Sequence, residues 1–216
     1  MATKNRAPGR RRNADATRTA ILASARQAFA RAGYDGAGLR EIAAGAGVTA
    51  MMVQRYFGSK ERLFAAVVAA VMAAPIILTP GNLASPALGD ALATGLVAAT
   101  QAGATPLDGF LIMLHSASSP RAAQIGRAQI EQHYHKTLTA ALRGDLAPQR
   151  AALILSLVAG VQVMRQMMGL SALAEAKPAA LVGILAPIFQ QLVEGERPGR
   201  TRARAGRRAT AVTRRR

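Results

Sequence analysis

Two histidines and one acid near the middle of the chain are the residues best placed for metal chemistry. His133 and His135 flank Tyr134, and Glu131 lies four residues before His135. On a helix, side chains two residues apart point in nearly opposite directions, so the two imidazoles do not share an ion. Glu131 and His135 lie on one helical face, where an ordinary surface pair is the expected arrangement. The spacing therefore predicts no metal site.

The residue types needed for catalysis are scarce. The chain of 216 residues has 11 acidic residues, three histidines and no cysteine. It contains no glycine-rich phosphate loop, no HExxH motif and no nucleophile elbow. We therefore expect neither an enzyme nor a bound cofactor. The lack of cysteine also excludes disulfide bonds and fits a reducing compartment.

Positive charge is concentrated at the two ends of the chain. The formal net charge is +17, of which residues 1–12 carry +5 and residues 196–216, with nine arginines and one glutamate, carry +8. The part between them is close to neutral, at +4. Such basic segments cannot bury enough apolar surface to fold, so we predict a disordered arm over 1–13 and a disordered tail over 196–216. Both would attract polyanions, which leaves nonspecific nucleic-acid binding as an alternative function.

Two uncharged runs raise the question of a membrane segment. Residues 63–79 contain Pro75 and are at the lower limit of length for a span, and residues 151–164 are too short. No apolar segment typical of a secretory signal follows the basic N-terminus. We therefore expect no membrane partner and a cytoplasmic location, with nucleoid association if the protein binds DNA.

The residue pattern predicts an all-α protein. Alanine and leucine dominate, aromatic residues make up 4% of the chain, and no apolar alternation typical of strands occurs. Glycine and proline separate the segments that have helical spacing. About nine helices are expected, over residues 17–32, 39–44, 50–57, 60–74, 86–102, 106–117, 120–143, 148–169 and 178–194.

The second and third expected helices form a helix-turn-helix pattern, in which the second helix of the pair enters the major groove of DNA. Gly45-Ala46-Gly47 separates them, Thr49 is a good N-cap for the third helix, and Ser59 is a good N-cap for the fourth. Taken alone, this pattern is a moderate signal for DNA binding, because many helical proteins contain one by chance.

Residues 17–68 resemble the tetracycline-repressor (TetR) family of transcriptional regulators. The order and spacing follow the family without a gap. The matching pieces are Ile21-Leu22 with Ala25 and Phe29, Gly33-Tyr34, Leu39 to Ala43, Ala46 to Val48, Tyr56-Phe57, Ser59 to Glu61, and Leu63-Phe64. The resemblance implies a DNA-binding domain over 14–62 and a helical ligand-binding and dimerisation domain over 63–195. It also implies a dimer that usually represses from a near-palindromic operator and is released by a small molecule.

The resemblance places the DNA contacts on the second and third helices and at the start of the fourth. Tyr56 and Lys60 match family positions that usually touch phosphate, and a phenol and an ammonium both suit that role. The amide of Gln54 can pair bidentately with adenine, whereas Met51 and Met52 offer only apolar contact. The predicted DNA-binding residues are Gly38, Arg40, Thr49, Met51, Met52, Gln54, Arg55, Tyr56 and Lys60.

The chain departs from the family pattern at three places on this surface. Ala37 and Gly38 replace the Ser or Thr that usually opens the second helix. Met51 stands where a small residue is usual, and Gln54 where a tyrosine is usual. We expect these changes to alter the operator sequence and the binding strength more than the class of ligand.

The last two predicted helices, 148–169 and 178–194, carry more apolar residues than one buried face requires. We expect them to pair with the same helices of a second copy in a four-helix bundle. A monomer that buries both faces in its own core is the alternative.

An effector pocket is expected among the middle helices, with a mostly apolar lining. The candidate residues are Phe110, Met113, His115, Tyr134, Met164, Arg165 and Met168. Methionines suit an adaptable pocket, although such a stripe is more often plain core. Arg165 is predicted to meet an acidic group of the ligand or an acid of the partner subunit. We therefore expect a small, largely apolar effector, and a helical carrier or enzyme remains a third alternative.

Overall fold

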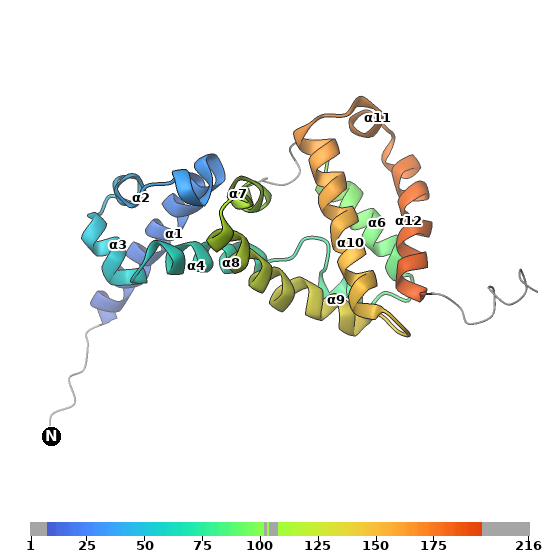
Figure 1. Cartoon of the computed structure of the whole chain (residues 1–216), viewed down its shortest axis with the longest axis horizontal. Coiled ribbons are helices and arrows are strands. Elements are labelled where there is room, and N and C mark those ends of the chain that lie inside the picture. The colour runs from blue at the N-terminus through green and yellow to red at the C-terminus, as the bar shows by residue number, and fades with distance from the viewer. Residues whose placement is uncertain (1–7, 102, 104–107, 196–216) are drawn as a thin grey trace, which may run out of the picture. The chain divides into compact units, whose positions relative to one another are not determined.

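The computed structural model describes residues 8–101, 103 and 108–195, which form helices and no strand (Figure 1). The prediction of an all-α protein is confirmed. The chain divides into two compact units. The first combines residues 1–75 with 105–134, and the second combines residues 76–104 with 135–216. The domain boundaries expected from the sequence, near residues 13, 62 and 195, remain a prediction about function.

The first unit is built on three aromatic rings. It contains α1 (Pro8–Gly36), α2 (Leu39–Gly45), α3 (Ala50–Phe57), α4 (Lys60–Met72), α7 (Asp108–Ser116) and α8 (Pro120–Ile130). The ring of Phe64 on α4 meets Phe29 and Tyr34 of α1 edge to face, each at 5.1 Å between centroids. Fully buried aliphatic side chains surround the rings, namely Ile21, Ile42, Val53, Leu63 and Ile112. The core therefore ties the helix-turn-helix to α4 and α7.

The second unit is built on the close packing of α6 (Leu88–Ala99) with α12 (Pro178–Glu194). A side chain on Gly89 would collide with Gln190, whose own amide oxygen accepts the Gly89 N–H at 3.0 Å. The other elements are α5 (Pro80–Leu83), α9 (Lys136–Ala141), α10 (Ala147–Gln162), the π-helix Val163–Met167 and α11 (Ser171–Ala174). Leu92, Leu96, Ile154, Leu185 and Phe189 are among its buried residues.

Arg150 on α10 is a buried cation that bonds only backbone carbonyls among its recorded partners. Its Nη1 donates to the carbonyls of Leu192 and Val193, at 2.8 and 2.9 Å. Its Nε and Nη2 donate to the carbonyls of Asp145 and Arg143, at 3.0 and 2.5 Å. Helix ends leave four carbonyls without intrahelical partners. Arg150 therefore closes the end of α12 and the turn before α10 together.

The first helix extends beyond both ends of its predicted range. It begins at Pro8 rather than near Thr17, because the polar residues of its first turns carry no apolar periodicity that the sequence could reveal. The helix thus enters the segment predicted as a disordered arm, whereas residues 1–7 and the tail 196–216 lie outside the described residues. Gly33 was expected to end the helix. It instead kinks α1, with φ 66° and ψ −175°, and helical residues continue to Gly36.

Several later helices are shorter than predicted or interrupted. The helix expected over 86–102 is α6, which is shorter at both ends and runs from Leu88 to Ala99. A short helix that was not expected, α5, precedes it, and Thr79 caps its first turn. Single π turns at Glu131–His135 and Val163–Met167 interrupt the helices predicted over 120–143 and 148–169. π-helical hydrogen bonding is rare and occurs mostly as single turns inside α-helices.

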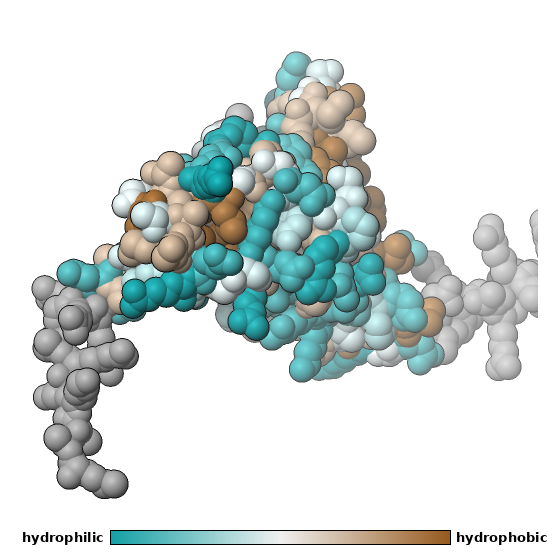
Figure 2. All heavy atoms as spheres, turned by 60° about the vertical axis from the view of Figure 1, so that its left-hand side comes forward, coloured by the Kyte–Doolittle hydropathy of each residue, from teal (hydrophilic) through white to brown (hydrophobic). Residues whose placement is uncertain are grey.

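Apolar side chains also reach the surface of the described residues. Figure 2 shows hydrophobic residues (brown) among hydrophilic ones (teal) on the face that it presents. The segment Ala147–Met167 is long and apolar enough to cross a membrane by length and composition alone, and it is the one such helix in the described ranges. Little of it is buried inside the chain, so burial in the chain's own core does not account for its apolar composition.

Candidate DNA-binding surface

The turn between α2 and α3 is shaped by its own residues. Gly47 adopts φ 65°, a conformation that glycine takes without a steric cost. Thr49 then caps α3, since its hydroxyl oxygen accepts the N–H of Met52 at 3.3 Å. From α1, the Ser24 hydroxyl donates to the carbonyl of Ile42 at 2.8 Å and fixes α2. Two short helices are thus held in the geometry of a helix-turn-helix.

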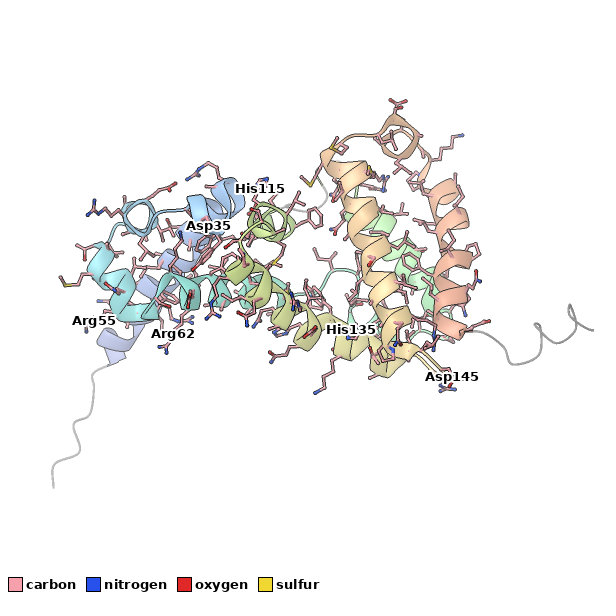
Figure 3. All side chains as sticks on the ribbon, in the orientation of Figure 1. Asp35, Arg55, Arg62, His115, His135 and Asp145 are labelled. Atoms are coloured by element: carbon pink, nitrogen blue, oxygen red, sulfur yellow. The ribbon has the colours of Figure 1, made fainter. Side chains whose placement is uncertain are left out.

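Helix α3 has a buried, apolar inner face and an exposed outer face. Val53 and Phe57 are buried in the first unit. Met51 is 80% exposed, and Gln54 and Arg55 are exposed as well, while Met52 is half-buried. In Figure 3, Arg55 projects from α3 away from the rest of the first unit. The predicted base-reading residues therefore share the solvent-facing side of this helix.

The start of α2 carries the two further predicted contacts, Gly38 and Arg40. Both are exposed. Gly38 is the N-cap of α2 with an extended backbone (φ −92°), and a side chain placed there would meet nothing within 4 Å. A Ser or Thr would therefore fit at this position, so the missing hydroxyl is not a consequence of crowding.

Tyr56 and Lys60 lie where α3 ends and α4 begins, and neither is fully exposed. Tyr56 packs half-buried against the core of the first unit. The Lys60 ammonium lies 3.3 Å from the carbonyl oxygen of Asp35 and 4.9 Å from the centre of the Tyr34 ring. An ammonium has three N–H donors, so these two contacts leave an N–H that can bond a phosphate oxygen.

Arg18 is a cation beside α3 that the sequence pattern did not single out. Its guanidinium carbon lies 5.2 Å from the centre of the Phe57 ring, and the residue is exposed. The spacing of α1 identified Arg18 only as a residue outside the apolar face. Its relation to Phe57 is a contact between separate helices, which no local pattern encodes.

Four of the predicted effector-binding residues lie in the first unit: Phe110, Met113, His115 and Tyr134. Phe110 and Met113 are half-buried on α7, and Gly126 of α8 leaves the space that the Met113 side chain enters. Burial raises the pKa of Tyr134, so its phenol stays neutral. His115 has a different role, because its Nδ1 lies 2.7 Å from the carbonyl of Ala30 and donates to it.

The other three predicted effector-binding residues, Met164, Arg165 and Met168, lie in the second unit. The two methionines are exposed. Arg165 is buried and donates to the carbonyls of Val97 and Leu173, at 2.8 and 3.1 Å, and to the Thr100 hydroxyl at 2.7 Å. Arg165 thus closes the end of α6 and holds α11, and its contact with an acidic group stays a prediction.

One of the two histidines considered for metal binding contacts the backbone. The His135 Nε2 lies 2.8 Å from the carbonyl oxygen of Pro148. Within the described part of the chain, no group of three or more His, Cys, Asp or Glu side chains could hold a metal ion.

Family models match both parts of the chain. Residues 21–67 match the model "Bacterial regulatory proteins, tetR family", and residues 87–193 match "Tetracyclin repressor-like, C-terminal domain". No curated protein sequence matches the chain.

Solved structures show the same fold. GusR from Salmonella enterica is 20% identical, with 82% of this chain and 95% of that chain covered at a TM-score of 0.65. FadR from Bacillus subtilis, in complex with stearoyl-CoA, is 16% identical, with 83% and 99% covered at a TM-score of 0.60. AibR, in complex with isovaleryl coenzyme A and operator DNA, is 18% identical, with 81% and 97% covered at a TM-score of 0.57.

The matches agree with the geometry of the first unit, where a capped helix presents exposed side chains from a helix-turn-helix. The two family models together match more than two thirds of the sequence. The chain therefore belongs to the tetR family of bacterial regulatory proteins and is a ligand-responsive, DNA-binding transcriptional regulator.

Proposed function

We propose that the protein is a cytoplasmic repressor that binds a near-palindromic operator as a homodimer and leaves it when a small, largely apolar effector binds. The observation that carries this proposal is the outer face of α3. Its exposed Met51, Gln54 and Arg55 stand on a helix that is anchored from behind by Val53 and Phe57. A rigid helix with an unpartnered mixed face suits the major groove.

Base reading and phosphate binding fall to different residues in this proposal. Gln54 supplies the directional amide, which can pair with adenine, and Met51 and Met52 supply apolar contact to thymine methyl groups. Arg55, with Arg40 and the backbone at Gly38, adds contacts at the edge of the surface. Tyr56 and Lys60 are the phosphate anchors that set the position of α3.

Alanine variants of Gln54 and Lys60 separate the two roles. Gln54→Ala is expected to relax discrimination at one base position of each half-site by about 1–3 kcal/mol, because one bidentate pair is lost. Lys60→Ala is expected to weaken all sequences alike and to lower the slope of log affinity against log salt by about 1 per subunit. Fluorescence anisotropy with duplexes of the DNA flanking its own gene, mutated one base at a time, measures both.

Matched variants far along the chain serve as controls. Gln101→Ala and Lys136→Ala remove exposed side chains of the same types in the second unit. Both should leave affinity and salt slope unchanged. Unchanged base preference in Gln54→Ala would remove Gln54 from base reading, and equal binding of random DNA by the native protein at physiological salt would contradict sequence-specific regulation.

The homodimer is supported by apolar side chains that α10 and α12 leave exposed. Ile184 is 62% exposed, and Leu153 and Ile188 are exposed as well, as is Met164 in the π-helix that follows α10. A side chain added at Gly160 or Gly183 would meet nothing within 4 Å, so both helices offer a flat place for close approach. A second copy laid on these faces would bury the surplus apolar area in a four-helix bundle.

Ile184→Asp is expected to convert the dimer to a monomer, because each chain would bring a charge into the apolar interface of the two-fold assembly. Sedimentation equilibrium measures the mass directly. Ile76→Asp is the matched control, since Ile76 is 55% exposed but lies outside α10 and α12. If Ile184→Asp sediments like the native protein, the interface lies elsewhere.

We propose Phe110, Met113 and Tyr134 as effector contacts in the first unit, and Met168 is a separate candidate in the second. The side chains are apolar or weakly polar, and methionine adapts to varied shapes. Two solved relatives hold acyl-CoA thioesters. We therefore propose acyl thioesters as the first effector class to test, by their release of the protein from DNA. A ligand acts only through its different affinities for the two states.

A further inference from the structure

We propose that Ser116 and Ser119, where α7 is joined to α8, are positioning residues. They hold Tyr34 and Asp35, the two residues that the phosphate anchor Lys60 contacts and that are called its seat below. The proposal rests on the phosphate role of Lys60 given above. Neither serine belongs to the DNA-binding surface, and neither stands out in the sequence. Both are almost completely buried, at 2% and 4% exposure, and both bond the end of α1.

Helix α1 is kinked at Gly33. In a regular helix the carbonyl of Ala30 and the N–H of Tyr34 bond each other, since they are four residues apart. The positive φ of Gly33 takes the chain out of helical geometry between them. Each group has a side-chain partner on α7: His115 Nδ1 at 2.7 Å from the Ala30 oxygen, and Ser116 Oγ, which accepts the Tyr34 N–H at 2.9 Å. The end of α7 is thus inserted where α1 opens.

Ser119 stands at the N-cap of α8, but its side chain makes no capping bond with that helix. A serine followed by proline at this position normally accepts an N–H of the first turn. Ser119 instead donates to Asp35 Oδ1 at 3.2 Å. Figure 3 shows Asp35 and His115 where the end of α1 meets α7. The serine therefore serves the fold of α1 rather than its own helix.

Tyr34 and Asp35 together form the seat of Lys60. The Lys60 ammonium contacts the Asp35 carbonyl and the face of the Tyr34 ring. The pKa of Tyr34 is raised, first by burial and then by the carboxylates of Glu61 and Asp35. The ring is therefore a neutral phenol whose π-face attracts the cation. The two residues that make the seat are the same two that the serines hold.

Glu61, the residue that follows Lys60, is paired with an arginine of α8. Arg121, in the first turn of α8, pairs with both carboxylate oxygens of Glu61, at 3.1 and 3.2 Å. Bidentate pairs of this kind fix direction as well as distance. The α7–α8 turn therefore holds Lys60 from two sides, through its seat and through its neighbour in the chain.

A double-mutant cycle in the full-length protein tests the proposal. Ser119→Ala and Ser116→Ala are each combined with Lys60→Ala, and affinity for one fixed duplex from the DNA flanking its gene is measured across a salt series. Each serine variant is expected to weaken binding about fivefold, the worth of one hydrogen bond, and to lower the salt slope. In the Lys60→Ala background the same serine change is expected to have no further effect.

A conservative variant and a distant variant serve as controls. Ser119→Thr retains the hydroxyl and is expected to restore affinity and slope, and Ser171→Ala, which removes an exposed serine of α11, should change neither. Ser116→Ala leaves a buried N–H without its partner, so its melting temperature is recorded. If that variant is unfolded, Ser119→Ala decides alone.

The outcomes are distinct. Serine effects that vanish without Lys60 support the proposal. Serine effects of equal size in both backgrounds, or none in either, overturn it while Lys60 remains an anchor. If Lys60→Ala itself binds like the native protein, the phosphate role fails, and this inference falls with it.

Discussion

Replacement of Gly33 with alanine is expected to destabilise the protein by about 4 kcal/mol and to lower its melting temperature by roughly 8–16 °C. Two costs combine. The backbone of Gly33, at φ 66° and ψ −175°, is in a region that side chains strongly disfavour. A Cβ at this position would also lie much closer to the carbonyl oxygen of His115 than van der Waals contact allows, and this oxygen is backbone and cannot rotate away.

The same substitution is expected to abolish operator binding. To make room, α7 must withdraw from α1, and the contacts of His115 and Ser116 with Ala30 and Tyr34 would be lost together. Differential scanning calorimetry and anisotropy measure the two effects. Gly38→Ala is the matched control for stability, because Gly38 has an ordinary negative φ and open space around it. A melting temperature in Gly33→Ala within 2 °C or so of the native value would mean that the kink relaxes without strain.

Replacement of Arg150 with alanine is the second large effect, expected at about 3–5 kcal/mol. The guanidinium donates to five backbone carbonyls that belong to two separate segments. Bonds to a charged donor are stronger than neutral ones, and the carbonyls would be left without partners at a buried site. Chemical denaturation measures the loss of free energy of unfolding.

Two further variants locate the cause of that loss. Arg150→Lys keeps the charge but not the planar fork, and is expected to recover less than half of the stability. Arg143→Ala removes an exposed arginine from the same turn and should cost little, although its backbone carbonyl still serves Arg150. Native stability in Arg150→Ala would show that water replaces the arginine at these carbonyls.

The parts of the structure that follow local rules could be predicted from the sequence. Thr49 and Ser59 cap α3 and α4 as expected, since a hydroxyl before a helix meets an N–H within three residues. Val53 and Phe57 have the four-residue spacing of one helical face, and both are buried. The family assignment was confirmed by models that match both halves of the chain. The roles of individual DNA-contacting residues remain predictions.

The parts that depend on distant segments could not be predicted. Gly33 has the same local pattern whether it ends a helix or kinks one, and only the carbonyl of His115, 82 residues later in the chain, decides between them. Arg165 looked like a lone cation available to a ligand, because the carbonyls that it meets have no sequence signature. Ser119 carries no signal in the sequence for its bond to Asp35, because that bond joins segments that lie far apart in the sequence.

The partners of Arg150 also have a consequence for how this protein can vary over evolution. Every residue type supplies a backbone carbonyl, so positions 143, 145, 192 and 193 can change identity without weakening their bonds to the arginine. No compensating substitution is ever required at those positions. Comparison of homologous sequences would therefore reveal Arg150 as a single constrained site without co-varying partners, although it joins two helices of the same unit.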